Sequence, residues 1–462
     1  MVQPVLDEPA GIWKQKLEPG DAAQSVAIAR EVAARLCDSV RIETAVASAR
    51  GQTGYPKSIH WHPTSLAQGH VGLGLLCGYL DACFPGEGWD LVGLKQLKIA
   101  ARAAERQLSP TYSMYSGLGG LALTALYLSR QGTRYRKLLA SIEAALLRLV
   151  VIAAKSLRAN HGVSVSTFDV ISGLSGVGGY LLLRRADSRH KSVLKAVLRS
   201  LVALTEEEGG LPRWHTPPRY ISDENSRQLY PHGNLNCGLA HGIPGPLALL
   251  SIAATAGVTV EGQREAIRRV AAWLYQYHMD DQWGLNWPTA VPIGPEGYPP
   301  RPPLIAKDER EGPAACWPSR AAWCYGSPGI ARALWLAGQA LNEVGYQELA
   351  VAAMEAVYRR PVSARQIDSP TFCHGVAGLQ QITLRFAQDT ALPLFTEAGR
   401  TLHRQILANY EPDSVLGYRN LEPGGRRIDQ AGLLDGAPGV VLVLLAASTT
   451  VEPLWDRLFL LS

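Results

Sequence analysis

The sequence predicts an all-α fold, an α/α toroid of seven inner and seven outer helices, on three observations. The same Gly-x-x-Gly turn occurs seven times, a short apolar segment follows each turn, and an amphipathic run precedes it. The turns lie at 69–72, 117–120, 173–176, 242–245, 326–329, 375–378 and 436–439. Their spacing of roughly 50 to 85 residues is the scale of a structural repeat. One such turn is a weak and common pattern, but seven copies in register with helix pairs indicate a repeat architecture.

The segments between the turns predict the two kinds of helix. Apolar segments directly after the turns predict buried inner helices, for example at 121–130, 246–254, 330–340 and 440–447. The runs before the turns carry apolar residues at helical spacing, which predicts outer helices with one exposed face. These runs include 22–40, 135–154, 191–207, 263–278, 346–359 and 394–408. Alternating inner and outer helices can close into a ring, which removes the exposed ends of an open repeat array.

Each turn should bring the start of an inner helix close to its neighbours. Glycine suits this place because it has no Cβ and accepts a positive φ, and a proline such as Pro328 is tolerated at a helix start. The residues just before the turns should therefore converge at the mouth of the toroid, although they are far apart in sequence. In chain order they are Gln68, Ser116, Ser172, His241, Tyr325, His374 and Asp435.

The repeats run through the whole chain, so we expect residues 1–462 to form a single toroid domain. Two irregular insertions interrupt the repeats, at about 209–236 and 281–319. Both are rich in proline and aromatic residues, and long loops of this kind are commonly functional or disordered. Because aromatic content favours order, our hypothesis is that they form the walls of a peptide-binding groove. Deletion of either insertion without loss of peptide binding would contradict it.

Composition narrows the class of protein. With 47% hydrophobic and 18% charged residues, the chain is typical of a globular protein with a large core. Its formal net charge of +5 is small and the basic residues are dispersed, so no nucleic-acid partner is expected. Seven cysteines, an odd number without short spacings, indicate reduced thiols.

The N-terminus and the hydropathy pattern predict the cellular compartment of the protein. Residues 1–20 lack the apolar core of a signal peptide, and no stretch approaches the ~20 apolar residues that span a bilayer. We therefore expect a cytoplasmic protein. Peripheral attachment at the inner face of the membrane, in a larger complex, leaves no such trace and stays open.

Two cysteines and a histidine occupy equivalent places before neighbouring turns. Cys324 precedes the fifth turn, Cys373 stands at the same place before the sixth, and His374 follows Cys373. Zinc binds thiolate and imidazole well, and catalytic zinc sites have three protein ligands and one open position. The three residues therefore predict a site for one Zn²⁺. The alternative, two buried cysteines that act as small apolar residues beside a core histidine, is disfavoured by the shared placement.

The remaining cysteines share no such placement, so we expect them to be structural: Cys37, Cys77, Cys83, Cys237 and Cys316.

Four motifs at these turns resemble the signature of a known enzyme family. They are FDVISGLSG at 168–176, LAHGIPG at 239–245, AAWCYGSPG at 321–329 and CHG at 373–375. Together they resemble the LanC lanthionine cyclases, and most of all the stand-alone bacterial members. The resemblance extends over about residues 66–440 and accounts for all seven turns.

The resemblance implies a lanthionine synthetase of the lyase class, a zinc-dependent cyclase of lantibiotic biosynthesis. Such an enzyme adds cysteine thiols of a dehydrated precursor peptide to dehydroalanine or dehydrobutyrine and closes lanthionine or methyllanthionine rings. A separate dehydratase makes the dehydroamino acids. The resemblance therefore also implies, as partners, that dehydratase and the export transporter of the same pathway.

The site residues of the family carry over to this chain. The resemblance implies that the zinc ligands are Cys324, Cys373 and His374. It implies that the active-site residues are His241, Asp169, Arg320 and Tyr325. The chain departs from some members at Ala321, where they have an acidic residue, and this puts the role of Arg320 in doubt.

Chemistry offers each active-site residue a role and an alternative. Attack of the thiolate on the β-carbon gives an enolate, which takes a proton at the α-carbon. His241 is the expected acid, and the alternative is that its side chain only makes hydrogen bonds within its turn. Arg320 either stabilises the enolate oxygen or forms a salt bridge with an outer helix. Asp169 either binds a histidine and sets its tautomer or caps the turn that follows. Tyr325 should line the pocket.

Two other functions stay open. A zinc-dependent prenylation of cysteine would need a basic diphosphate pocket and normally an acidic zinc ligand, neither of which can be located. A LanC-like protein that adds glutathione to dehydroamino acids, or a non-catalytic scaffold for thiols and peptides, is only weakly disfavoured. Neighbouring genes for a dehydratase and a Cys/Ser/Thr-rich precursor would distinguish these functions.

Overall fold

A computed structural model describes residues 13–15, 17–130, 132–297 and 318–462. Its contacts divide the chain into two compact units. The first unit consists of Met1–Leu146 and Ile367–Asp456, and the second consists of Leu147–Gln366 and Arg457–Ser462. Each unit is therefore assembled from two separate stretches, and the single domain predicted above stays a prediction.

Each of the seven Gly-x-x-Gly turns leads into a helix that is buried over most of its length. These inner helices are α3 (His70–Cys83), α5 (Leu118–Leu128), α7 (Leu174–Leu183), α10 (Pro244–Thr255), α12 (Ser327–Leu341), α15 (Val376–Thr390) and α17 (Ala437–Ser448). Every residue of α7 and α17 is buried. A helix that is apolar all round is stable only when it is surrounded, so the inner helices form the cores of the units.

The amphipathic runs form the outer helices. They are α1 (Pro19–Cys37), α4 (Trp89–Glu105), α6 (Arg136–Ala159), α8 (Ser188–Leu204), α11 (Gln263–Gln276), α13 (Val344–Arg359) and α16 (Pro393–Ala408). In α11 the buried residues Ala266, Ile267, Val270, Ala271 and Leu274 recur at helical spacing on one face. The predicted inner and outer segments coincide with these helices, with ends shifted by a few residues.

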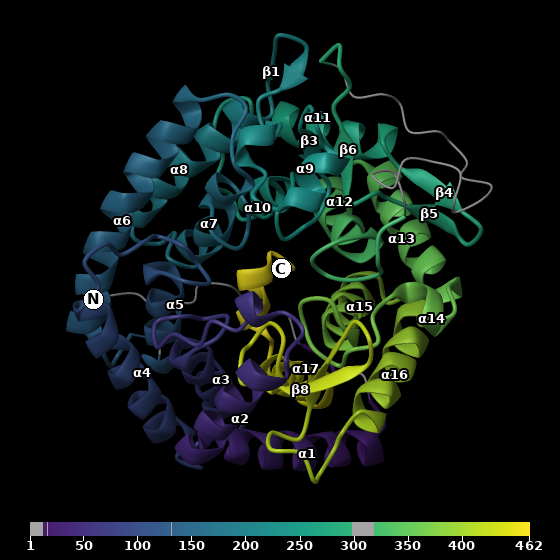
Figure 1. Ribbon diagram of the computed structural model, residues 1–462. Helices are drawn as coiled ribbons and strands as arrows, with labels where there is room; N and C mark the ends of the chain where they lie inside the picture. The colour runs from purple at the N-terminus through teal and green to yellow at the C-terminus, as the bar shows by residue number, and fades with distance from the viewer. Residues whose placement is uncertain (1–12, 16, 131, 298–317) are drawn as a thin grey trace. The chain divides into compact units, whose positions relative to one another are not determined.

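Neighbouring repeats pack side by side within each unit (Figure 1). In the first unit α3 lies between α5 and α17, and α17 also contacts α15. In the second unit α10 lies between α7 and α12. Outer helices cover them, as α1 covers α17 and α13 covers α12. The first and last repeats, which contain α3 and α17, are therefore neighbours, as the predicted closure requires.

Backbone hydrogen bonds connect the turns of neighbouring repeats, always through the carbonyl two residues before the first glycine. We call this series the turn ladder. Its acceptors in the first unit are the carbonyls of Ala67, Tyr115 and Leu434, and in the second unit those of Ala240 and Cys324. Leu433 N donates to Ala67 O over 2.7 Å, which connects the seventh turn to the first. The ladder aligns the residues just before the glycines of adjacent turns.

Close approach of the backbone explains the first glycine of each turn. A Cβ at Gly326 would lie 1.6 Å from Arg320 O, and one at Gly69 would lie 1.9 Å from His62 O. The other five first glycines would place a Cβ within 2.5 Å of a backbone atom. Among these seven first glycines, only Gly326 has a φ in the left-handed region, at 99°. The turn therefore needs glycine mainly for space, and conformational freedom matters at one of seven positions.

The two insertions pair with each other. Strand β3 (Asn234–Asn236) of the first insertion runs antiparallel to β6 (Ala290–Pro292) of the second, with Leu235 opposite Val291. The expectation of order holds for the described part of both insertions, while 298–317, including Cys316, lies outside the described residues. The other elements in and around them are β1 (Glu207–Glu208), β2 (Leu211–Pro212), η3 (Pro218–Tyr220), α9 (Glu224–Leu229), β4 (Met279–Asp281) and β5 (Gly284–Asn286).

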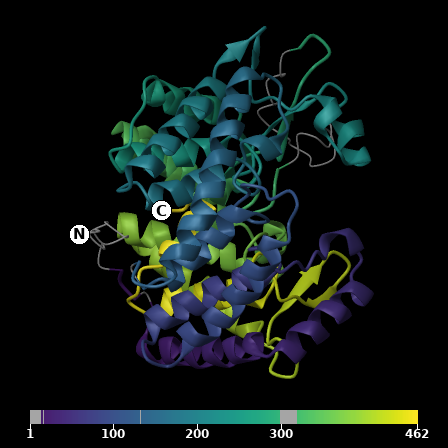
Figure 2. The ribbon, with the colours of Figure 1, turned by 90° about the vertical axis from the view of Figure 1, so that its left-hand side faces the viewer.

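Several elements of the first unit have no counterpart in the predicted repeats. Helix α2 (Ser39–Gln52) lies against the hairpin of β7 (Arg419–Glu422) and β8 (Arg426–Asp429). In Figure 2 this hairpin is yellow and the helix is purple. Thr53 donates a hydrogen bond of 2.6 Å to Glu422 and fixes this contact. The remaining elements among the described residues are η1 (Pro56–Ser58), η2 (Val165–Thr167), α14 (Val362–Arg365) and η5 (Leu454–Phe459). Among the described residues, no helix is both long and apolar enough to cross a membrane.

Candidate active site

In the second unit, the structure joins two of the predicted active-site residues. His241 Nδ1 lies 2.6 Å from Asp169 Oδ2. Asp169 is 1% exposed, whereas the side chain of His241 is 37% exposed. Because the carboxylate accepts the proton of Nδ1, the imidazole keeps Nε2 as the nitrogen that can exchange a proton with a substrate.

The same aspartate also caps its turn. Asp169 Oδ1 accepts hydrogen bonds from the backbone N–H groups of Ser172 and Gly173, each at 2.7 Å. The backbone N–H of the next residue, Val170, donates to Ala240 O. This bond belongs to the turn ladder and connects the third turn to the fourth. Both alternatives considered for Asp169 are therefore realised, one on each carboxylate oxygen.

Tyr325 lies beside His241. The centroids of their rings are 6.2 Å apart, and Asn236 Nδ2 donates to the phenol oxygen of Tyr325 over 3.2 Å. Gly238 faces the Tyr325 ring so closely that a Cβ there would lie 2.6 Å from it. The tyrosine is therefore held in place on the flank of the histidine.

Arg320 and Ala321 lie on the segment that leads to the fifth turn. The Arg320 side chain is half-buried and makes no ion pair with any described residue, so the alternative of a salt bridge with an outer helix is not found. Ala321 N donates to Arg365 O, which ties the segment to the end of α14. Ser319 lines a cavity of about 670 Å³ together with Asp281, Trp283, Asn286, Arg360 and Gln366.

Cys324 lies in the second unit. It is 7% exposed, and its carbonyl accepts from Ala240 N at 3.2 Å in the turn ladder. This bond places Cys324 in the turn next to that of His241. None of the cysteines in the described ranges forms a disulfide.

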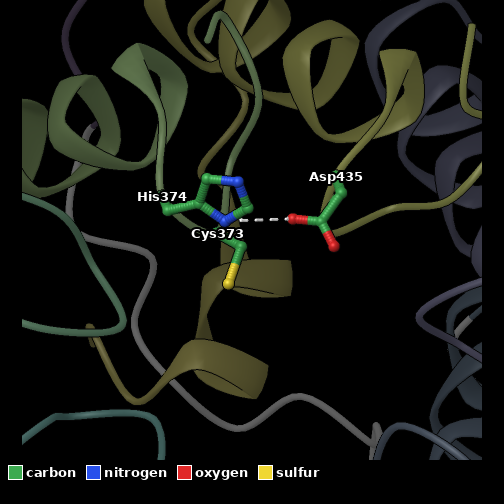
Figure 3. Close-up of side chains that lie close together, drawn as sticks. All are labelled: Cys373, His374 and Asp435. Atoms are coloured by element: carbon green, nitrogen blue, oxygen red, sulfur yellow. Dashed lines mark ion pairs between the residues drawn. The ribbon is translucent and has the colours of Figure 1, made fainter. Parts of the chain in front are cut away.

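In the first unit, Cys373 and His374 form a cluster with Asp435 (Figure 3). One ligand atom from each of the three residues lies within 4.8 Å of the others. His374 Nδ1 lies 3.4 Å from Asp435 Oδ1, and both side chains are half-buried. The turn ladder creates the cluster, because Cys373 N donates to Leu434 O over 2.9 Å.

The donor set of the cluster fits a metal ion. A thiol, an imidazole and a carboxylate are all zinc ligands. Burial raises the pKa of the Asp435 carboxyl, an effect that nearby His374 opposes. Asp435 Oδ1 is buried and accepts no hydrogen bond from the described part of the chain, and a cation held between it and His374 would satisfy it.

The predicted site residues thus fall into two groups. His241, Asp169, Tyr325, Arg320 and Cys324 belong to the second unit, while Cys373 and His374 belong to the first. The complete zinc triad stays a prediction. The sequence assigned no role to Asp435, although it holds the same position before the seventh turn as His374 does before the sixth.

Comparison with known proteins gives consistent matches. The profile described as lanthionine synthetase C-like protein matches residues 60–460. The nisin biosynthesis protein NisC of Lactococcus lactis subsp. lactis is 27% identical over 339 residues, which cover 72% of this chain and 73% of that protein. A solved structure of nisin cyclase covers 91% of this chain and 96% of its own, with a TM-score of 0.70 at 24% identity. Its fold is an α/α toroid, so the predicted fold class is confirmed.

Proposed function

Because the chain belongs to the lanthionine synthetase C-like family, we propose that it is a lantibiotic cyclase that closes thioether rings. It adds cysteine thiols of a dehydrated precursor peptide to dehydroalanine or dehydrobutyrine, which gives lanthionine or methyllanthionine. In this role it is a lanthionine synthetase, a carbon–sulfur bond-forming enzyme of the lyase class. The observation that carries the proposal is the Cys373–His374 pair, held beside Asp435 at the position that the family resemblance implies for metal ligands.

One zinc ion completes the site, held by Cys324, Cys373 and His374. The fit of the first-unit cluster to a metal supports this assignment, as does the equivalent placement of Cys324 before its turn. When bound, zinc supplies the positive charge that keeps a substrate thiol deprotonated at neutral pH, where a thiol of pKa about 8.5 is mostly protonated.

His241 gives the proton that the α-carbon needs after the sulfur has attacked the β-carbon. Its hydrogen bond to Asp169 supports this role, because a buried carboxylate at Nδ1 orients the ring and stabilises the imidazolium before the proton leaves from Nε2. Tyr325 flanks the ring and limits its rotation. Arg320, which forms no ion pair with the described residues, is available to stabilise the enolate oxygen.

The substrate is a peptide, and we assign its binding to the two paired insertions. The cavity lined by Trp283 and Ser319 of the second insertion and by Arg360 supports this, because it combines an aromatic side chain with the ion pair between Arg360 and Asp281. The dehydratase that prepares the peptide and the transporter that exports it are the expected pathway partners. The protein then works in the cytoplasm or at the inner face of the membrane.

Incubation with a dehydrated precursor peptide tests the activity. Ring closure leaves the peptide mass unchanged but removes thiols that can be alkylated, so the loss of thiols counts the rings formed. A peptide that gains the mass of glutathione when glutathione is present, and loses no thiol of its own, would instead identify a glutathione-adding protein.

Replacement of a ligand tests the zinc site. Cys324→Ala should abolish both stoichiometric zinc and ring closure, because two protein ligands hold the ion poorly. Cys83→Ala, which removes a thiol that lies 3.7 Å from the Thr449 hydroxyl just after α17, serves as the control and should keep both. Full metal content in purified Cys324→Ala protein would contradict the ligand assignment.

A further inference from the structure

Asn236 contacts the phenol of Tyr325, which lies beside the predicted acid His241. It is the last residue of β3, so it belongs to the first insertion and lies opposite Ala290 of the second. Its side chain is half-buried, and Nδ2 donates to the phenol oxygen of Tyr325 over 3.2 Å. The rings of Tyr325 and His241 have their centroids 6.2 Å apart. All of these residues belong to the second unit.

The orientation of the Asn236 amide is fixed by the segment that leads into the fourth turn. Oδ1 accepts a hydrogen bond from the N–H of Gly238 over 3.0 Å, so the amide N–H₂ group is the one that faces Tyr325. The backbone of the turn also lies close on the other side. A Cβ at Gly242 would lie 2.7 Å from Oδ1, and Ile243 N donates to Asn236 O over 3.1 Å. The amide therefore cannot turn over without the loss of its bond to Gly238.

This arrangement determines the role of the phenol oxygen. An amide N–H₂ group can only donate, so the oxygen of Tyr325 is the acceptor in this bond and its own proton points away from Asn236. Gly238 also limits the position of the ring, because a Cβ there would lie 2.6 Å from two ring carbons of Tyr325. Asn236 therefore sets the direction of the phenol O–H.

The frame around Asn236 is held by backbone bonds that do not depend on its amide. Ala240 N donates to Cys324 O over 3.2 Å and connects the fourth turn to the fifth. Cys237 N donates to Thr289 O over 3.0 Å and connects the first insertion to the second. These bonds form whichever side chain stands at position 236. A change of the Asn236 amide should therefore affect the phenol more than the frame.

We propose that Asn236 is a positioning residue, which directs the O–H of Tyr325 toward the carbonyl oxygen of the dehydroamino acid. This inference rests on the cyclase function proposed above. Negative charge develops on that oxygen when a thiolate adds to the β-carbon, and a donor that is already oriented stabilises it without further reorganisation. Because Asn236 also pairs with the second insertion, one residue connects the strands that we assign to peptide binding with a donor to the bound peptide.

Asn236→Asp tests the inference, because it keeps the shape of the side chain and reverses one hydrogen bond. The carboxylate still accepts from Gly238 N, but it now also accepts from the phenol, whose proton is thereby withdrawn from the substrate. We expect kcat for ring closure, measured by thiol loss, to fall about 10²-fold. The KM for the dehydrated peptide and the zinc content should change little. Tyr325→Phe should cause a similar loss of kcat, because it removes the same donor.

The double variant separates positioning from a structural role. Tyr325→Phe has no phenol to direct, so the addition of Asn236→Asp should slow ring closure by no more than about 2-fold. A double variant slowed by the product of the two single effects would overturn the inference, as would an Asn236→Asp protein with the wild-type kcat. If Asn236→Asp does not fold, Asn236→Ala takes its place. It removes the bond to the phenol without reversing it, so it should slow ring closure about 10-fold and show the same lack of additivity.

Asn160→Asp is the matched control. This exposed asparagine of the second unit donates to Ser156 O just after α6, and its replacement should leave kcat unchanged. A wild-type protein that closes no ring in a dehydrated peptide would overturn the cyclase function itself. Ring closure by the wild type with additive effects of the two substitutions would overturn only the role of Asn236.

Discussion

At the scale of single residues, Asp169 shows how one side chain joins scaffold and chemistry. One oxygen holds the N–H groups of Ser172 and Gly173, and the other holds the imidazole of His241. The turn and the orientation of the histidine are therefore set by the same buried group. Any change at Asp169 that spares one function must keep one oxygen as an acceptor.

Asparagine at this position separates the two functions. In Asp169→Asn the amide oxygen still caps the turn, but the amide N–H₂ faces Nδ1 of His241 and favours the wrong tautomer. We expect ring closure to slow about 10²- to 10³-fold while zinc content and melting temperature stay near the wild-type values. Asp169→Ala should lower both rate and melting temperature, because it removes the cap as well. Equal rates for wild-type and Asp169→Asn proteins, measured by thiol loss, would remove His241 and Asp169 from the proton transfer.

The sequence singled out candidate residues for the site, but it did not show which groups they contact. The shared position before neighbouring turns was enough to single out Cys324, Cys373 and His374. The bond between His241 and Asp169 joins residues 72 positions apart, so it depends on how two repeats pack. Asp435 was visible only as a residue at the repeated position, because a lone aspartate before a glycine is equally typical of a turn.

At the scale of elements, the second glycine of the fifth turn lets the start of α12 approach the segment that leads into the fourth turn. A Cβ at Gly329 would lie 2.4 Å from Trp323 O and 2.8 Å from Leu239 Cβ. Trp323 belongs to the same turn, while Leu239 belongs to the turn before it. Both contacts lie in the core of the second unit, where backbone and packed side chains have little room to move.

Gly329→Ala should therefore destabilise the protein by about 1–3 kcal/mol, the usual cost of overpacking. Gly345, near the start of α13, has nothing within 4 Å of its Cβ position and is exposed, so Gly345→Ala is the matched control. That control should be neutral or stabilising by about 0.5 kcal/mol. Denaturant unfolding of the three proteins compares these free energies, and equal stability of Gly329→Ala and wild type would contradict the role of close approach.

Long periodic elements were predicted well and short ones were missed. The seven inner helices and the outer helices follow directly from turns and apolar spacing. Helix α2 and the hairpin of β7 and β8 were not predicted, because α2 buries only three residues and the strands are four residues long. Such segments owe their conformation to tertiary contacts such as Thr53 with Glu422, which no local pattern shows.

At the scale of the whole molecule, the end of the chain belongs to a different unit from the residues before it. Arg457–Ser462 is part of the second unit. There Phe459 O accepts from Trp323 Nε1 at 3.1 Å, and Leu461 O accepts from Arg332 Nε at 2.7 Å. Trp323 immediately precedes Cys324, so the last residues support the segment that carries a predicted zinc ligand.

Removal of residues 459–462 should destabilise the protein by at least ~5 kcal/mol, because Phe459, Leu460 and Leu461 are fully buried. It also removes the acceptors of Trp323 and Arg332, one of which is a buried cation. Removal of Ser462 alone keeps both carbonyls and should change the melting temperature little. Thermal unfolding measures the effect, and an unchanged melting temperature after the longer deletion would contradict it.

The turn ladder has a consequence for how such an enzyme can diversify. Its bonds use only backbone carbonyl and N–H groups, and the acceptors come from residues as different as Ala67, Tyr115, Leu434 and Cys324. Side chains at these positions can therefore be exchanged during evolution, or by a protein engineer, without loss of the connections that hold the repeats together. The same frame can present sulfur, imidazole, phenol or carboxylate at fixed places, and new chemistry needs new side chains there rather than a new fold.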